Sequence, residues 1–155
     1  MMKIKWICPT APTRPIPGVA GFNAATWCDY DMGVVCTEES PYDDLGGLDA
    51  SATRVANLLS TEPAGSKIKL GVGGIGVGAA IALHSATCFA RGQYHNGSAY
   101  PPINLTAILA LNGWLPQART LDSFCSSSCC RTGHHLSPDD ERAHIIYWLN
   151  TVFQL

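Results

Sequence analysis

The chain has 155 residues, of which 46% are hydrophobic and 14% are charged. This composition is typical of one globular domain and excludes an intrinsically disordered chain. With a net charge of −2 and no apolar run long enough to span a bilayer, the sequence predicts neither a nucleic-acid partner nor a membrane span.

The cysteines indicate a reducing compartment. There are seven of them, an odd number. Several lie within apolar segments, where a free thiol behaves as a small hydrophobic group. The apolar part of the opening segment is too short for a signal peptide. Together these features predict a cytoplasmic protein with reduced cysteines.

The first third of the chain predicts a strand, a loop and a helix. Ile4–Cys8 is a short apolar run that predicts a buried strand, and Pro9 ends it. An extended proline-rich loop then continues to about Gly21. Apolar residues recur at helical spacing over Leu48–Thr61, which predicts an amphipathic helix. Asp49 falls outside the apolar stripe of that helix and is expected on its polar side.

Two further strands and two further helices are expected beyond this point. Lys67–Gly73 predicts the second strand and Leu105–Leu111 the third, a continuous apolar run typical of a central parallel strand. Ala79–Ala90 is apolar nearly all round and predicts a buried helix, with Gly92 as its C-terminal stop. A last helix is expected to begin at Ser137, where a capping serine precedes a proline and two acids.

Strands that alternate with helices predict an α/β fold. We expect one domain over residues 1–155, with a small, mostly parallel sheet of about three to four strands flanked by helices. So small a sheet has open edges, which could support association between copies of the chain.

The turn between the second strand and the buried helix carries the most informative motif. Gly74-Ile75-Gly76-Val77-Gly78 has glycines at the first and fifth positions, as in the G-x-S-x-G nucleophile elbow of α/β-hydrolases. The central position, which holds the nucleophilic serine in that motif, is Gly76. Ser85 lies more than two helical turns further on and cannot replace it.

Six segments in the same order resemble one family, the acyl-protein thioesterases of the phospholipase/carboxylesterase branch of α/β-hydrolases, and its plant members in particular. These segments are Ile4–Pro15, Trp27-x-Asp29, Asp43–Ser51, Leu70–Ala80, Leu111–Pro116 (with Asn112 in place of the usual serine) and Gly133–Asp140. Colinear matches in six places are far more specific than any one motif.

The resemblance implies a reaction and its machinery. Members hydrolyse an acyl thioester or ester, such as a palmitoylated protein, with a serine nucleophile, a histidine base and an aspartate. An acylated protein or a lipid ester is therefore the expected partner, and no cofactor or metal is expected. By the same resemblance, His134 corresponds to the triad base and Gly76 to the nucleophile position. The backbone N–H of Val77 corresponds to one oxyanion donor.

The departures from the family pattern predict that hydrolysis has been lost. Besides the glycine at position 76, no counterpart is found for the family's upstream H-G-L-G-D segment. None is found either for the G-x-x-D segment that carries its aspartate between the elbow and His134. We therefore expect a truncated α/β-hydrolase domain that is catalytically inactive or nearly so. The alternative role is that of a non-catalytic pseudoenzyme that binds an acyl group, a lipid or a protein.

Three other patterns in the sequence have simpler interpretations than a functional site. Gly71–Gly76 is a formal G-x-G-x-x-G, but no acidic residue follows about 20 positions later, so a dinucleotide cofactor is not expected. Pro9-x-x-Pro12-x-x-Pro15 could bind an SH3-like groove, although a rigid loop is the simpler interpretation. A cluster of cysteines and histidines near the C-terminus could bind zinc, but a polar loop is the simpler interpretation. Two of its cysteines are adjacent to each other, and so are its two histidines, which is a poor spacing for one tetrahedral site. That cluster contains Cys125, Cys129, Cys130, His134 and His135. His84 and His95 have no predicted role.

Overall fold

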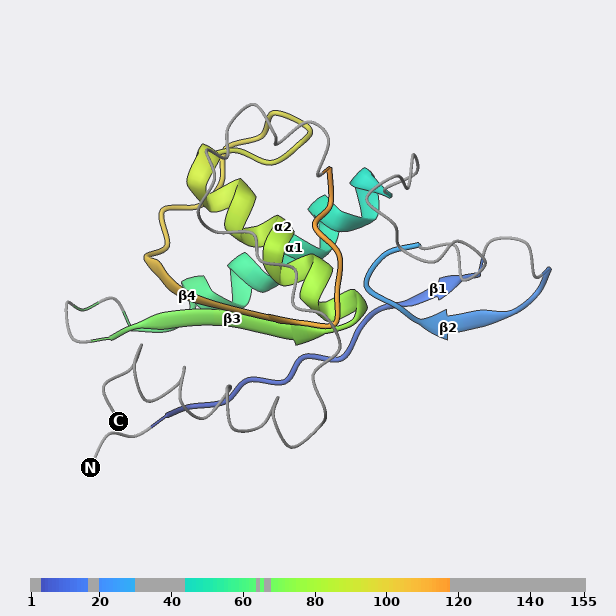
Figure 1. Cartoon of the computed structure of the whole chain (residues 1–155), viewed down its shortest axis with the longest axis horizontal. Helices are drawn as coiled ribbons and strands as arrows, with labels where there is room; N and C mark the ends of the chain where they lie inside the picture. The colour runs from blue at the N-terminus through green and yellow to red at the C-terminus, as the bar shows by residue number, and fades with distance from the viewer. Residues whose placement is uncertain (1–3, 17–19, 30–43, 64, 66–67, 118–155) are drawn as a thin grey trace. The chain divides into compact units, whose positions relative to one another are not determined.

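A computed structural model describes residues 4–16, 20–29, 44–63, 65 and 68–117 (Figure 1). The described residues from Thr10 onward belong to one compact unit, and those before Thr10 to another. The elements are β1 (Thr13–Pro15), β2 (Asn23–Ala25), α1 (Leu45–Ser60), β3 (Leu70–Ile75), α2 (Val77–Arg91) and β4 (Leu105–Leu111). No helix in the described part of the chain is long and apolar enough to cross a membrane.

The two central strands are parallel, as an α/β fold requires. β3 and β4 pair in register from Gly71 with Ala107 to Ile75 with Leu111, and α2 makes the crossover between them. β4 has the predicted bounds. β3 begins at Leu70 and continues through the elbow glycines to Ile75, so the predicted strand over residues 67–73 was placed two to three residues too early.

Both predicted helices in this region are confirmed, and their ends have clear local causes. The Asp44 side chain caps α1 by accepting a hydrogen bond from the Gly47 N–H at 2.9 Å. α2 ends at Gly92, which takes the left-handed conformation (φ 69°) expected of a C-terminal stop. α2 packs against both strands, and α1 packs against α2 (Figure 1).

Two apolar clusters form the core of the described part of this unit. In the first, Ala52 and Ala56 of α1 meet Cys88 of α2 and the two tyrosines Tyr94 and Tyr100 that follow that helix. In the second, Leu48 of α1 and Ile81 of α2 enclose Cys28, with Trp27 and Trp114 packed around them. Small residues at the helix contact let the two helix backbones approach closely.

Two N-terminal predictions are wrong. Ile4–Cys8 has no secondary structure and is exposed, with Trp6 69% exposed. A short apolar run does not by itself determine a strand, because a strand also depends on a partner elsewhere in the chain. The proline-rich segment is also more than a loop, because β1 within it pairs antiparallel with β2. The helix predicted from Ser137 lies outside the described residues.

Candidate functional site

The elbow is built by a single residue with an unusual backbone conformation. Gly76 joins β3 to α2 with φ 58° and ψ −120°, a positive-φ geometry that glycine adopts far more readily than other residues. Its N–H donates to the Leu111 carbonyl oxygen at 2.9 Å, and its own carbonyl oxygen accepts the Ala79 N–H at 3.0 Å. The turn is therefore held by β4 on one side and by α2 on the other.

Position 76 has room for a side chain but carries none. Apart from its two chain neighbours, no described residue has an atom within 4 Å of a Cβ atom built on Gly76. The described residues therefore leave space for a side chain at this position. The elbow predicted from the sequence is present, and its central position offers only backbone atoms.

The first turn of α2 presents backbone donors beside this open space. Within the described residues, neither the Val77 N–H nor the Gly78 N–H donates to a backbone carbonyl outside the helix. Unpaired N–H groups at a helix N-terminus favour a negative charge, and in hydrolases such groups bind the oxyanion. Val77 is the first residue of α2, and its role as an oxyanion donor stays a prediction. His134 lies outside the described residues, so its relation to the elbow stays a prediction as well.

Close backbone packing explains the residues around the elbow. A Cβ atom on Gly74 would collide with the backbone of Gly78, and one on Gly113 would collide with the Ala79 methyl group. Asn112, which precedes Gly113, also has a positive φ of 49°. The turn after β4 therefore lies directly against the elbow, and its close approach depends on glycine.

No family model and no curated protein matches the chain. Among solved structures, the crystal structure of Zea mays acyl-protein thioesterase 2 matches with 54% sequence identity and a TM-score of 0.65. The match covers 80% of this chain. The chain belongs to the acyl-protein thioesterase family of α/β-hydrolases. It spans about half of the maize protein, 51% of that chain. The family predicted from the sequence and the α/β-hydrolase fold class are both confirmed.

A second polar cluster in this thioesterase homologue has no counterpart among the predicted site residues. His84 of α2 is only 3% exposed, and its Nε2 atom lies 2.8 Å from Oδ1 of Asp49 on α1. Cys88, one turn further along α2, places its Sγ atom 3.5 Å from the same Nε2. The expectation that Asp49 lies on the polar side of α1 is wrong, because its partner is a second helix that periodicity cannot reveal.

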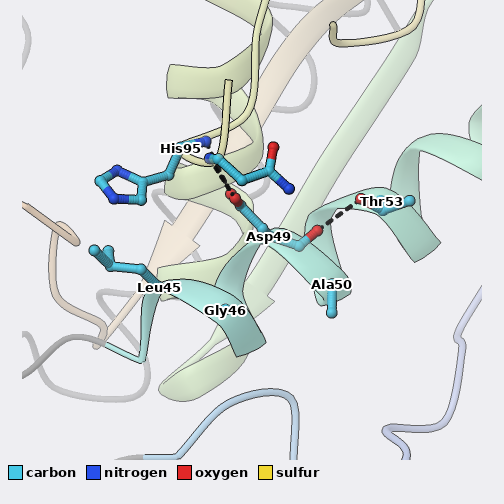
Figure 2. Close-up of a pocket in the computed structure, with 7 residues that line it drawn as sticks. Leu45, Gly46, Asp49, Ala50, Thr53 and His95 are labelled. Carbon is cyan, nitrogen blue, oxygen red and sulfur yellow. Dashed lines mark hydrogen bonds between the residues drawn. The ribbon is translucent and has the colours of Figure 1, made fainter. Parts of the chain in front are cut away.

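Backbone donors also hold the Asp49 carboxylate. Oδ1 accepts the His95 N–H at 3.1 Å, and Oδ2 accepts the Asn96 N–H at 2.9 Å. Burial alone would raise the pKa of Asp49, but the hydrogen bonds from His84 and from these two amides outweigh it and hold the pKa below its usual value. Figure 2 shows the carboxylate directed toward the loop that carries His95, at the edge of a cavity of about 270 Å³.

The cluster is not a nucleophilic triad. In such a triad the nucleophile and the carboxylate contact opposite nitrogens of the histidine. One nitrogen accepts the proton of the nucleophile, while the other donates a hydrogen bond to the carboxylate, which orients the ring. Here Asp49 and Cys88 share Nε2. Burial also raises the pKa of Cys88 to about 12, which leaves its thiol protonated and unreactive at neutral pH. The helical spacing of His84 and Cys88 was the one signal in the sequence that could have drawn attention to this cluster.

Proposed function

We propose that this chain is an acyl-protein thioesterase homologue that has lost serine-dependent hydrolysis. The observation that carries the proposal is Gly76, which forms the turn between β3 and α2 without a side chain, at the position that corresponds by resemblance to the family's nucleophile. Removing the nucleophile of a serine hydrolase lowers kcat by about 10⁶-fold. The partner implied by the family resemblance is an acylated protein or a lipid ester. This chain would bind such a molecule without cleaving it.

Acyl binding without turnover is the role that the elbow supports best. Ile75, the residue before Gly76, is a large apolar side chain with 71% of its surface exposed. It ends β3 and directly precedes Gly76 and the first residues of α2, Val77 and Gly78. A fatty acid could place its carboxylate at these donors and its hydrocarbon chain against Ile75. Three described cysteines, Cys8, Cys28 and Cys88, are free thiols, which supports the cytoplasmic location that we propose for this pseudoenzyme.

An assay of three proteins tests the loss of hydrolysis. Wild type, Gly76→Ser and Gly76→Ala are incubated with a p-nitrophenyl ester and an acyl thioester, and a fluorophosphonate probe reports any activated serine. We expect no turnover and no labelling in any of them, because no aspartate segment of the family type lies between Gly76 and His134. Turnover by the wild-type chain would overturn the proposal. Turnover by Gly76→Ser alone would show that the glycine at position 76 is by itself sufficient to explain the loss of hydrolysis.

Titration with a fluorescent fatty acid tests the binding role separately. Wild type should bind saturably, and Ile75→Ser should bind at least several-fold more weakly. Ile68→Ser is the matched control, since Ile68 is also exposed, at 39%, but precedes β3. Equal binding by both variants, or no saturable binding by wild type, would contradict acyl binding at the elbow.

A further inference from the structure

We propose that Asp49, His84 and Cys88 form a binding site for a zinc ion between α1 and α2. The three side chains are buried, and their donor atoms (a carboxylate oxygen, an imidazole nitrogen and a sulfur) all lie within 4.8 Å of one another. His84 is about two helical turns beyond the elbow. This role is independent of acyl binding at Gly76.

Two of the three distances between the donor atoms are near those of a zinc site. Zinc bonds of about 2.0–2.3 Å in a tetrahedron separate nitrogen from oxygen by about 3.3 Å and nitrogen from sulfur by about 3.6 Å. The cluster has 2.8 Å between Nε2 of His84 and Oδ1 of Asp49, and 3.5 Å between Nε2 and Sγ of Cys88. Because all three donor atoms lie within 4.8 Å of one another, rotations of the side chains would bring them around a single ion.

The donor set favours zinc over the other common divalent ions. Magnesium and calcium prefer oxygen ligands, whereas a mixture of sulfur, imidazole and carboxylate suits zinc. His84 and Cys88 are four residues apart on α2, so they project from the same face of one helix. Asp49 reaches them from α1, so the ion would join the two helices.

The Asp49 carboxylate is already oriented as a ligand would be. Its hydrogen bonds from the His95 and Asn96 amides fix the plane of the carboxylate independently of His84. Outer hydrogen bonds of this kind are typical of metal-binding carboxylates. The cavity of about 270 Å³ beside Asp49 gives an ion access to the carboxylate (Figure 2).

A buried hydroxyl group near Cys88 provides a second, independent observation. Tyr100 packs in the same apolar cluster as Cys88, and its Oη atom is buried without a hydrogen-bond partner among the described residues. Three protein ligands leave one position of a tetrahedral zinc ion for a water molecule. Such a water would give a buried hydroxyl the partner that it lacks. On binding, the Cys88 thiol releases its proton to solvent, and no electron transfer is involved.

Cobalt substitution tests the site, because Co²⁺ bound to a thiolate absorbs in the near ultraviolet and visible. The full chain is freed of metal with a chelator and titrated with Co²⁺, and Zn²⁺ is then added to displace it. We expect a saturable thiolate band in wild type and its loss in Cys88→Ser and in His84→Phe. A control in which Cys8, Cys28, Cys36, Cys125, Cys129 and Cys130 are all changed to serine should keep the band.

Three results would overturn the proposal: no thiolate band in wild type, a band that survives in folded Cys88→Ser, or a band lost in the folded control. The last of these would assign the metal to the other cysteines. Far-UV circular dichroism establishes whether each variant is folded. A second measurement needs no variant. Zinc should slow alkylation of Cys88 in partly denatured wild-type protein at least several-fold, as read by peptide mass mapping, and an unchanged rate would contradict the site.

Discussion

Gly74 lies so close to the backbone of Gly78 that no side chain fits between them. The two residues are the first and fifth positions of the elbow motif, yet their requirements differ. A Cβ atom on Gly78 would meet no described residue within 4 Å outside its chain neighbours and its own helix backbone. The close approach of β3 and α2 therefore requires glycine at the first position of the motif. It does not require glycine at the fifth.

This asymmetry predicts opposite effects of the same substitution. Gly74→Ala should destabilise the fold by several kcal/mol or prevent folding, because the new methyl group collides with backbone that cannot move freely. Gly78→Ala should be neutral or stabilising by up to about 1 kcal/mol, since Gly78 lies in the first turn of α2 and alanine favours helix. Urea unfolding followed by circular dichroism measures both. Equal effects of the two variants would contradict the elbow geometry.

The conformation of Gly76 predicts a moderate penalty for any side chain there. Gly76→Ala and Gly76→Ser should each lower the free energy of unfolding by about 1–3 kcal/mol, because φ is positive while space is available. Thermal or urea unfolding gives the values. A much larger loss in both variants would mean that the position is crowded, and no loss would mean that φ is not positive there.

The stabilising contacts of the Asp44 side chain at the start of α1 should be sensitive to acid. Its carboxylate caps the helix through the Gly47 N–H, accepts the Asp29 N–H and lies 3.0 Å from Nη2 of Arg14. Although burial would raise the pKa of Asp44, these hydrogen bonds and the Arg14 charge outweigh it and hold the pKa below the ordinary 3.8. A lowered folded-state pKa means that the stabilisation is fully present above the unfolded value and is lost as the pH falls through the folded one.

Asp44→Ala should therefore cost about 1–2 kcal/mol at pH 7, and the difference from wild type should shrink as the pH falls below about 3.8. Asp44→Asn is the matched control, because asparagine also caps helices but carries no charge. It should lose less than the alanine variant at pH 7. Urea unfolding of all three proteins at pH 7 and at pH 3 makes the comparison. A difference between Asp44→Ala and wild type that grows on acidification would contradict the prediction.

Replacing Asp49, at the contact between α1 and α2, should lower the free energy of unfolding more than replacing Asp44. Asp49→Ala leaves the buried His84 ring and the His95 and Asn96 amides without their acceptor. The expected loss in metal-free protein is about 3–5 kcal/mol, as for other buried polar pairs deprived of one partner. Asn57→Ala, an exposed change on the same helix, should alter stability by no more than a few tenths of a kcal/mol. Similar losses in the two variants would refute a central role for Asp49.

The described thiols should differ sharply in reactivity. Cys8 is exposed, while Cys28 and Cys88 are buried. Burial raises the pKa of Cys88 to about 12, so little thiolate forms at pH 8. Iodoacetamide should modify Cys8 in the native protein and modify Cys28 and Cys88 only after denaturation. Peptide mass mapping over time gives the rates, and rapid native labelling of Cys88 would contradict its burial.

The sequence predicted the elements whose signals are local. α1, α2 and β4 follow from apolar periodicity or from one continuous apolar run, and Gly92 and the elbow follow from the backbone demands of turns. The segment 4–8 could not be predicted in the same way, since a strand depends on a neighbour elsewhere in the chain.

The same reason explains why the polar cluster was missed. Asp49 and His84 are 35 positions apart. On α1 alone, an aspartate beside an apolar stripe is the pattern of a solvated face. Only the packing of α2 against α1 places an imidazole at that carboxylate. Nothing within one helix carries this information, so residue periodicity gave the opposite prediction.

Gly76 and Asn112 together have a consequence for how this lineage can change. Both occupy positive-φ positions, one in the elbow and one in the turn packed against it. Glycine and asparagine are the residue types that adopt such backbone angles at the least conformational cost. Serine, which the family pattern has at both positions, adopts these angles at a higher conformational cost. Replacing either residue with serine should therefore lower the stability of the fold, so a serine at position 76 would be selected only if it brought a gain in function.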